Sequence, residues 1–435
     1  MIKPLLVYSA PLMTESGYGH KSRAIAKALI ATKSDEYEIM FLPQRWGNTS
    51  WIDVDDEQIT SRINQSGQLP KQPDVWIMDT ISSEFIPVGK YNIGICSGIE
   101  TTICDPSWIE GNNKMNLVLT SSEHSKNVFK NSRFEQRDQR NGQTVGIIEN
   151  KVPIEVLSES LDLKVFFKFL PTKDTKLVEK IDLLVNEPFI FLMVGHWIHN
   201  GHSLEILGED RKNVGLLIKI FLETFKNKPN PPALLLKTSG SNSSTIDKEE
   251  ILKRIDDIRK TVKGTLPNIY LLHGELEDQQ MNELYNHPKV KAMVSITKGE
   301  GFGRPLLEFS ITQKPIITTN WSGHLDFLKP EFTTLLPGTM KNVHPAAVVK
   351  NIILPESEWF NVDTVSVGMA LTDMYKNYKN YEVNGKRQAH FSKTNFSQEK
   401  MEEKLKVILD TYLPKIPKFV PLTISKINLP TLNKE

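Results

Sequence analysis

The chain has 435 residues, of which 39 % are hydrophobic and 24 % are charged, and its formal net charge is +1. A chain of this length is expected to form two or three domains with sizeable cores. The near-neutral charge excludes a global basic field for nucleic acid or for an acidic membrane. No run approaches the roughly 20 apolar residues of a membrane span. The two cysteines, Cys96 and Cys104, form neither a disulfide framework nor a zinc spacing, so we expect a cytoplasmic protein.

The first half of the chain alternates short apolar runs with helical patterns. Residues 21–31 carry apolar side chains at helical spacing. Lys21 and Arg23 stand at the start of that helix, where cations are unfavourable, which indicates an anion or an acidic partner, although solvated surface charge is the commoner explanation of such a placement. Strands are predicted at residues 5–9, 37–43, 75–79, 91–96 and 117–120, and finally at residues 145–148. This alternation favours a parallel sheet covered on both faces.

The second half repeats the β–α pattern after a polar stretch over residues 158–186. Strands are predicted at residues 188–194, 233–237, 268–272, 292–296 and 315–319, and helices at residues 216–225, 249–262 and 279–285. Residues 398–412 form an amphipathic helix in this interpretation. Because ligands of open parallel sheets bind beyond the carboxyl ends of the strands, the functional site is expected between the two halves.

The most informative stretch reads Lys298-Gly-Glu-Gly-Phe-Gly-Arg-Pro-Leu-Leu-Glu308 and follows the predicted strand at 292–296. Pro305 suits a helix start, because its missing N–H would have no intrahelical partner there. A strand, a glycine-rich turn and a helix start place unpaired N–H groups around an anion. The carboxylates of Glu300 and Glu308 would repel a phosphate and are better matched to hydroxyls, such as those of a ribose and a sugar. The turn alone is equally compatible with a purely structural connection.

Glu300 and Glu308 form a Glu-x7-Glu pair within Gly-Glu-Gly-Phe-Gly-x-Pro-Leu-Leu-Glu. This pattern resembles the signature of retaining GT-B glycosyltransferases of the "glycosyl transferases group 1" family. The resemblance implies an α/β protein of two Rossmann-like parallel-sheet domains that face each other across a cleft. It also implies a C-terminal helix that crosses back to the first domain.

The domain boundaries follow from combining this resemblance with the element pattern. An acceptor-side domain is predicted over residues 1–165, completed by the helix that crosses back at about 395–420. A nucleotide-sugar domain is predicted over residues 180–390. Residues 414–435 form a tail that contains proline and lysine and cannot be one helix.

The resemblance assigns a donor site to the second domain. Glu308 would hold the ribose hydroxyls, and Glu300 would hold the sugar together with the amides of Gly301, Phe302 and Gly303. The diphosphate would be neutralised by cationic side chains and amide dipoles.

Lys212 matches the family's lysine for the diphosphate, but His196 stands where the family has an arginine, and residues 198–207 are an insertion. Either Arg211 replaces that arginine or the phosphate site is built differently. Lys237, at the end of the next predicted strand, is a further donor-binding residue in this interpretation.

Two segments of the first half are compatible with a role in the site and equally with an ordinary structural role. Gly17 and Gly19 resemble the family's glycine loop, which closes over the donor phosphates, but a tight strand–helix turn would use the same residues. Glu100 stands near the position of a histidine in relatives and could orient an acceptor hydroxyl or accept its proton. It could equally cap a helix.

The predicted activity is transfer of a hexosyl or pentosyl group from a nucleotide-diphosphate sugar, with uridine diphosphate as the expected nucleotide, to an acceptor hydroxyl. Neither a metal nor a cofactor is expected, and Asp53 and Asp55 are interpreted as solvated surface rather than a metal motif. The alternatives are a sugar-nucleotide epimerase and a non-catalytic nucleotide-sugar-binding protein. The acceptor stays open among a glycan, a lipid-linked molecule, a small molecule and a modified nucleic-acid base. Basic residues could border a nucleic acid, although mixed acids favour a solvated loop: Lys126, Lys130, Arg133, Arg137 and Arg140.

Overall fold

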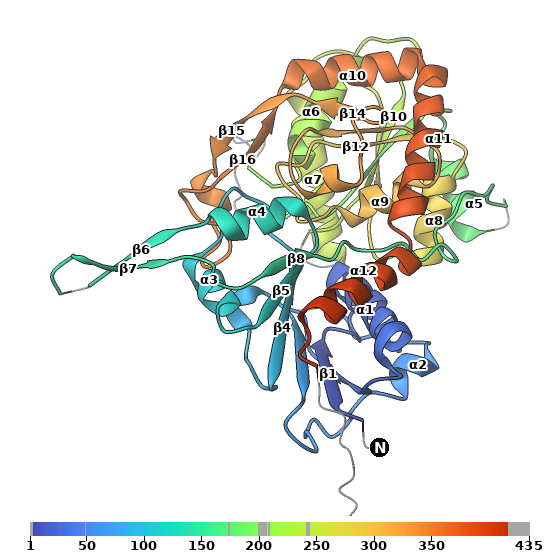
Figure 1. Cartoon of the computed structure of the whole chain (residues 1–435). Helices are drawn as coiled ribbons and strands as arrows, with labels where there is room; N and C mark the ends of the chain where they lie inside the picture. The colour runs from blue at the N-terminus through green and yellow to red at the C-terminus, as the bar shows by residue number, and fades with distance from the viewer. Residues whose placement is uncertain are drawn as a thin grey trace, which may run out of the picture.

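The computed structural model describes residues 3–47, 49–138, 140–172, 175–198, 207, 209–240 and 244–415 (Figure 1). Most of the insertion at 198–207 and the tail from residue 416 onward lie outside these described residues. The chain forms two parallel sheets, each with six strands among the described residues.

The first sheet has the strand order β2-β1-β3-β4-β5-β8, and every neighbouring pair is parallel. Its strands are β1 (Leu5–Ala10), β2 (Glu38–Pro43), β3 (Val75–Asp79), β4 (Tyr91–Cys96), β5 (Leu117–Thr120) and β8 (Ile154–Val156). The helices of this half are α1 (Gly17–Lys33), α2 (Glu57–Thr60), α3 (Pro106–Asn112) and α4 (Glu123–Asn131).

The second sheet has the order β11-β10-β9-β12-β13-β14 and is also parallel throughout. Its strands are β9 (Ile190–Val194), β10 (Ala233–Lys237), β11 (Ile269–Leu272), β12 (Val290–Ser295), β13 (Ile316–Thr319) and β14 (Thr334–Leu336). The helices are α5 (Lys176–Leu184), α6 (Val214–Phe225), α7 (Thr245–Lys260), α8 (Asp278–Asn286), α9 (Arg304–Ser310), α10 (Thr364–Lys376), α11 (Tyr378–Asn395) and α12 (Gln398–Tyr412). An antiparallel arm, β15 (Gly338–Asn342) with β16 (Glu358–Val362), follows β14.

Both sheets are buried on both faces, which explains why their strands are nearly continuous apolar runs. In β1, Leu5 packs into one core cluster, whereas Leu6 packs into another. In β9, Phe191 and Leu192 divide in the same way between two clusters. Successive side chains of a strand point to opposite faces, so each sheet needs a layer of helices on each side.

The C-terminal helix α12 returns to the first half and packs on α1. Met401, Leu405 and Leu409 of α12 share a core cluster with Ile25 and Leu29 of α1. In Figure 1 the red α12 lies beside the blue α1. The predicted fold class, including the helix that crosses back, is confirmed.

One predicted strand is present, but it does not belong to the first sheet. Residues 145–148 do not complete the first sheet but belong to β7 (Thr144–Ile148), which pairs antiparallel with β6 (Phe134–Arg137). This hairpin projects from the body (Figure 1). Val145 and Ile147 are 62 % and 51 % exposed, so its apolar positions bury too little surface to join the sheet. The sixth strand is instead β8, whose Ile154 is buried.

Candidate functional site

The loop between β12 and α9 touches the first half of the chain backbone to backbone. Gly301 accepts a hydrogen bond at its carbonyl from Ser122 Oγ at 2.6 Å. A Cβ at Gly301 would lie 2.8 Å from Ser97 O, and one at Gly299 would lie 2.0 Å from Glu100 O. Glycine is therefore required at both positions for the two halves to approach this closely. The contact lies at the carboxyl ends of β12, β4 and β5, where open parallel sheets bind ligands.

Two cations and two carboxylates meet beside this contact. Lys212 Nζ lies 2.5 Å from Glu300 Oε1, and Arg211 NH1 lies 3.2 Å from Glu300 Oε2. Arg211 Nε also lies 2.8 Å from Oε2 of Glu100, which belongs to the first half. Arg211 further donates a hydrogen bond to Gly299 O at 2.8 Å. The structure thus brings together four of the predicted catalytic and donor-binding side chains, although their roles stay predictions.

The local charges shift the ionisation of these groups. Burial alone would raise the pKa of Glu300, but the positive charges of Lys212 and Arg211 outweigh it and lower the pKa to about 2. Burial lowers the pKa of Lys212, although Glu300 opposes this. Burial raises the pKa of Glu100, and the Arg211 charge only partly offsets it. Glu300 is therefore held ionised, whereas Glu100 binds a proton more readily than an ordinary carboxyl group.

The cations stand directly before α6, at a helix end that ordinarily disfavours positive charge. Asn213, the residue preceding α6, has a left-handed φ of 55°, and Asp210 Oδ2 accepts a hydrogen bond from Val214 N at 3.0 Å. Helix dipole and cationic side chains here act in the same direction. An anion in front of α6 would be stabilised by both.

Glu308 lies on the first turns of α9 with partners of its own. It accepts a hydrogen bond from Tyr285 OH at 3.0 Å and pairs with Arg304 Nε at 2.8 Å. Burial raises its pKa, and Arg304 opposes the shift. Gly303 has φ 98° before the first residue of α9, a left-handed conformation that favours glycine. A ribose bound to Glu308 would share the carboxylate with Arg304.

The remaining predicted donor residues lie around this centre. Gly19 N donates to Ser16 Oγ at 3.0 Å, and a Cβ at Gly19 would meet Thr14 O at 2.0 Å, so this glycine is explained by the turn itself. Gly17 is exposed and has no atom within 4 Å of an added Cβ, which leaves room for a ligand.

Two other predicted residues are occupied by structural contacts. The Phe302 side chain packs in a core cluster against Phe327, with ring centroids 5.0 Å apart, so only its amide could reach a ligand. Lys237 Nζ donates to Gly274 O at 2.5 Å instead of joining the Glu300 cluster. Lys237 nevertheless lies close enough to His196 to lower its pKa, after burial and Lys212.

The structure identifies two charged partners that the sequence analysis did not name. Lys21, for which an acidic partner was expected, pairs with Asp79 at 2.8 Å inside the first half, where both side chains are buried. Arg304 had no assigned role, yet its NH1 lies 3.7 Å from Glu159 Oε2 of the segment that joins the halves. The unfavourable charge at the start of each helix is the only local signal for either partner.

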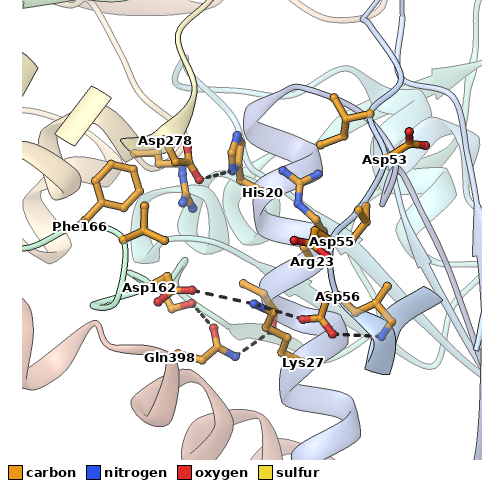
Figure 2. Close-up of a pocket in the computed structure, with 17 residues that line it drawn as sticks. His20, Arg23, Lys27, Asp53, Asp55, Asp56, Asp162, Phe166, Asp278 and Gln398 are labelled. Atoms are coloured by element: carbon orange, nitrogen blue, oxygen red, sulfur yellow. Dashed lines mark hydrogen bonds and ion pairs between the residues drawn. The ribbon is translucent and has the colours of Figure 1, made fainter. Parts of the chain in front are cut away.

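A cavity of about 240 Å³ lies between α1, the loop before α2 and the second half (Figure 2). His20 of α1 spans one side of it, with Nδ1 3.4 Å from Asp278 Oδ2. Arg304 lines the cavity and so connects it to Glu308. Asp53 and Asp55 also line it but are exposed, as predicted for surface residues. Within the described ranges, no group of three or more His, Cys, Asp or Glu could hold a metal ion.

No protein-family model matches the chain, and no curated protein matches it. Several solved structures do match the chain. A glycosyltransferase from Rickettsia africae ESF-5 aligns with TM-score 0.62 and 13 % identity over 95 % of this chain and all of that chain. Sucrose-phosphate synthase from Thermosynechococcus elongatus aligns with TM-score 0.59 and 11 % identity, covering 94 % and 98 % of the two chains. The Anabaena protein Alr3699/HepE, solved with UDP and glucose, aligns with TM-score 0.57 and 11 % identity, covering 94 % and 100 %.

The chain has the GT-B fold. In this GT-B chain the strand ends of both sheets meet at the Gly301 contact, so the Glu300 cluster occupies the cleft between the two Rossmann-like domains. None of the helices in the described part of the chain has the length and apolar character that crossing a membrane requires.

Proposed function

We propose that the protein is a glycosyltransferase that moves a sugar from a nucleotide-diphosphate sugar to an acceptor hydroxyl, with retention of the anomeric configuration. The convergence of Arg211 and Lys212 on Glu300 in the cleft carries this proposal. Two adjacent cations before a helix N-terminus match a leaving group that gains negative charge as its bond breaks. The GT-B fold of the solved glycosyltransferases supports the same activity.

In this proposal the diphosphate binds in front of α6 and takes over Lys212 and Arg211 from their carboxylate partners. The bond from the anomeric carbon to the phosphate oxygen breaks, and the electron pair stays on the diphosphate, where the two cations stabilise it. The cleft excludes water and holds both substrates in one orientation, which lowers the barrier further.

The carboxylates take different roles because their ionisation differs. Glu300, with its pKa lowered to about 2, stays ionised and can both accept sugar hydroxyls and stabilise positive charge that develops on the sugar. Glu100, with a raised pKa, is suited to take the proton of the acceptor hydroxyl as the new bond to the anomeric carbon forms. Glu308 accepts ribose hydroxyls.

We propose that the nucleotide of the donor is uridine diphosphate. Alr3699/HepE was solved with UDP-glucose, and the E. coli trehalose-6-phosphate protein was solved with UDP-2-fluoro glucose. The latter aligns with TM-score 0.56 at 10 % identity. Both ligands are hexosyl donors, so we propose a hexosyl group as the transferred sugar.

The test combines UDP-glucose, as the donor probe, with a panel of hydroxyl acceptors. Release of UDP together with a glycosylated product that keeps the α-anomeric proton in its NMR spectrum is the expected result. Incubation with donor alone separates an epimerase, which would change the sugar without an acceptor. Absence of UDP binding by calorimetry, with no turnover of UDP-, GDP- or ADP-glucose, would refute the proposal.

A further inference from the structure

Three aromatic residues, Tyr18, Trp46 and Trp51, follow the ends of β1 and β2 in the first half. Tyr18 and Trp46 stack with ring centroids 3.7 Å apart and an interplanar angle of 22°. Both are only partly buried, and Trp51 is 48 % exposed. Arg45 lies over the Trp51 ring at 5.8 Å. Exposed aromatic surface of this kind is a common feature of ligand sites.

The cluster is held in place by the backbone. The chain after β2 folds back on the loop after β1: Glu15 N donates to Ser50 O at 3.0 Å, and Ile52 N donates to Met13 O at 2.9 Å. These bonds fix Trp51 beside Thr14, with which it forms an antiparallel bridge. The aromatic surface is therefore preformed.

Tyr18 connects this surface to the candidate catalytic residues. Lys21 Nζ lies 4.7 Å from the Tyr18 ring and donates to Ser97 Oγ at 2.8 Å, and Ser97 belongs to the loop that carries Glu100. Burial raises the pKa of Tyr18, and the nearby charges of Asp79 and Glu100 add to this shift. A molecule stacked on the outer face of Trp46 would thus lie one aromatic ring away from Tyr18, on which the Glu100 charge acts. Gly17, exposed and without neighbours, leaves space on the same side.

The charge around the aromatic surface selects against anions. Between residues 45 and 57 the chain has one cation, Arg45, and four carboxylates: Asp53, Asp55, Asp56 and Glu57. In the adjoining cavity five carboxylates outnumber three cations, Arg23, Lys27 and Arg304, so a phosphate group would meet no net positive charge there. Carboxylates are in contrast good acceptors for hydroxyl groups.

The same segment lines the cavity of about 240 Å³ through Asp53, Asp55 and Asp56 (Figure 2). His20 and Asp278 point toward each other at its edge. The cavity lining thus contains both donors and acceptors of hydrogen bonds. This volume lies below the roughly 300–1,000 Å³ of sites for drug-sized ligands and suits one small polar ring.

We propose that Tyr18, Trp46 and Trp51 form the acceptor subsite, and that the acceptor is a neutral saccharide. The apolar C–H face of a sugar ring stacks on Trp46 and Trp51, with Tyr18 supporting the inner face of Trp46, while the sugar hydroxyls reach the carboxylates of the adjoining segment. This inference rests on the proposed glycosyltransferase function and adds its acceptor class. It favours a carbohydrate over a phosphorylated compound or a nucleic-acid base.

The experiment uses the full chain with UDP-glucose as donor and maltose, cellobiose, glucose 6-phosphate and a single-stranded 12-base oligonucleotide as acceptor probes. Variants are Trp51→Ala, Trp46→Ala and Trp46→Phe, with Phe167→Ala as the matched control, because Phe167 is an exposed aromatic of the segment that joins the halves. Acceptor and donor KM are measured for each. Saturation-transfer NMR of disaccharide binding without donor gives a readout that does not depend on turnover.

A neutral disaccharide should be the best acceptor. Trp46→Ala and Trp51→Ala should each raise its KM about tenfold and weaken its NMR signal, while the UDP-glucose KM changes less than about twofold. Trp46→Phe should retain most of the affinity, and Phe167→Ala should resemble wild type. Because Trp51 is half exposed, its variant tests the subsite even if Trp46→Ala fails to fold.

The inference is overturned if glucose 6-phosphate or the oligonucleotide is preferred, or if disaccharide affinity is unchanged in Trp46→Phe, Trp51→Ala and Trp46→Ala alike. UDP binding and UDP-glucose hydrolysis that persist in that case would leave the proposed function standing. Loss of all UDP binding by the wild-type protein would instead contradict the proposed function, while NMR would still decide whether the aromatic surface holds a saccharide.

Discussion

Arg211 and Glu100 face each other across the cleft, with Nε of the guanidinium 2.8 Å from Oε2 of the carboxylate. Arg211 comes from the loop before α6, and Glu100 from the loop after β4, so the ion pair joins the two domains. The same guanidinium reaches Glu300 at 3.2 Å. A diphosphate that forms an ion pair with Arg211 would weaken the ion pair between Arg211 and Glu100. Donor binding would then free the carboxylate proposed to receive the acceptor proton.

The pH dependence of transfer should identify Glu100. A base must be ionised, and the pKa of Glu100 is raised above its ordinary value by burial. Activity should therefore fall as pH decreases through a pKa above 4.5. Glu300, with a pKa of about 2, cannot produce this acidic limb. The limb of kcat/KM against pH should disappear in Glu100→Gln.

Glu159→Gln is the matched control, because burial also raises the pKa of Glu159, although it lies outside the Glu300 cluster. The acidic limb should persist in this variant. An unchanged limb in Glu100→Gln would assign the proton transfer to another group.

Removal of the Lys212 charge should slow the chemical step more than it weakens binding. Lys212→Met leaves Glu300 with Arg211 as its only close cation among the described residues and removes one positive charge from the leaving group. Loss of one such group costs about 100- to 1,000-fold in kcat. Steady-state kinetics with UDP-glucose should show this loss, with partial recovery in Lys212→Arg. Equal kcat in Lys212→Met and wild type would place the lysine outside the reaction.

Glu308 can be tested by changing the ligand together with the residue. If its carboxylate accepts a ribose hydroxyl, wild-type protein should bind UDP more tightly than 2′-deoxy-UDP by about tenfold or more, since hydrogen bonds to charged groups contribute about 1.5–3 kcal/mol. Glu308→Gln should bind both ligands with nearly equal affinity in calorimetry. Tyr285 and Arg304 lose their partner in this variant, so its melting temperature should also fall.

Comparison of the two ligands on one folded protein separates binding from stability. A preference for the ribonucleotide that survives in Glu308→Gln would show that another group reads the ribose. The residue would then be structural, held between Arg304 and Tyr285.

The local parts of this site could be predicted from the sequence, whereas its connections between domains could not. A buried run, glycines and a proline define the turn that carries Glu300, because each residue type there restricts the backbone by itself. The pairing of Glu100 with Arg211 joins residues of separate domains and leaves no local pattern. Phe302 illustrates the same limit, because only the packed core shows that its ring turns away from the cleft.

The sequence also did not reveal which short strand completes the first sheet, for a related reason. Residues 145–148 and 154–156 both form short strands with apolar side chains, but the first pairs with β6 outside the main sheet, and only the second pairs with β5. Burial, rather than propensity, decides between them.

The buried pair of Lys21 and Asp79 should contribute to folding in a way that single and double substitutions distinguish. Asp79 accepts hydrogen bonds from Lys21 Nζ at 2.8 Å, and from Tyr8 OH and Ser22 Oγ at 3.0 Å each. Asp79→Leu leaves the ammonium of Lys21 buried without its carboxylate, which costs about 3–5 kcal/mol of unfolding free energy.

In Lys21→Met/Asp79→Leu no buried charge is left uncompensated, so the double variant should be more stable than Asp79→Leu alone. Urea midpoints of the four proteins in this cycle measure the coupling. Additive losses would show that Lys21 finds other partners once Asp79 is gone, with Ser97 Oγ, which already accepts a hydrogen bond from Lys21 Nζ at 2.8 Å, as the nearest acceptor. The pair would then be replaceable, and the stability of the first domain would rest on its apolar clusters alone.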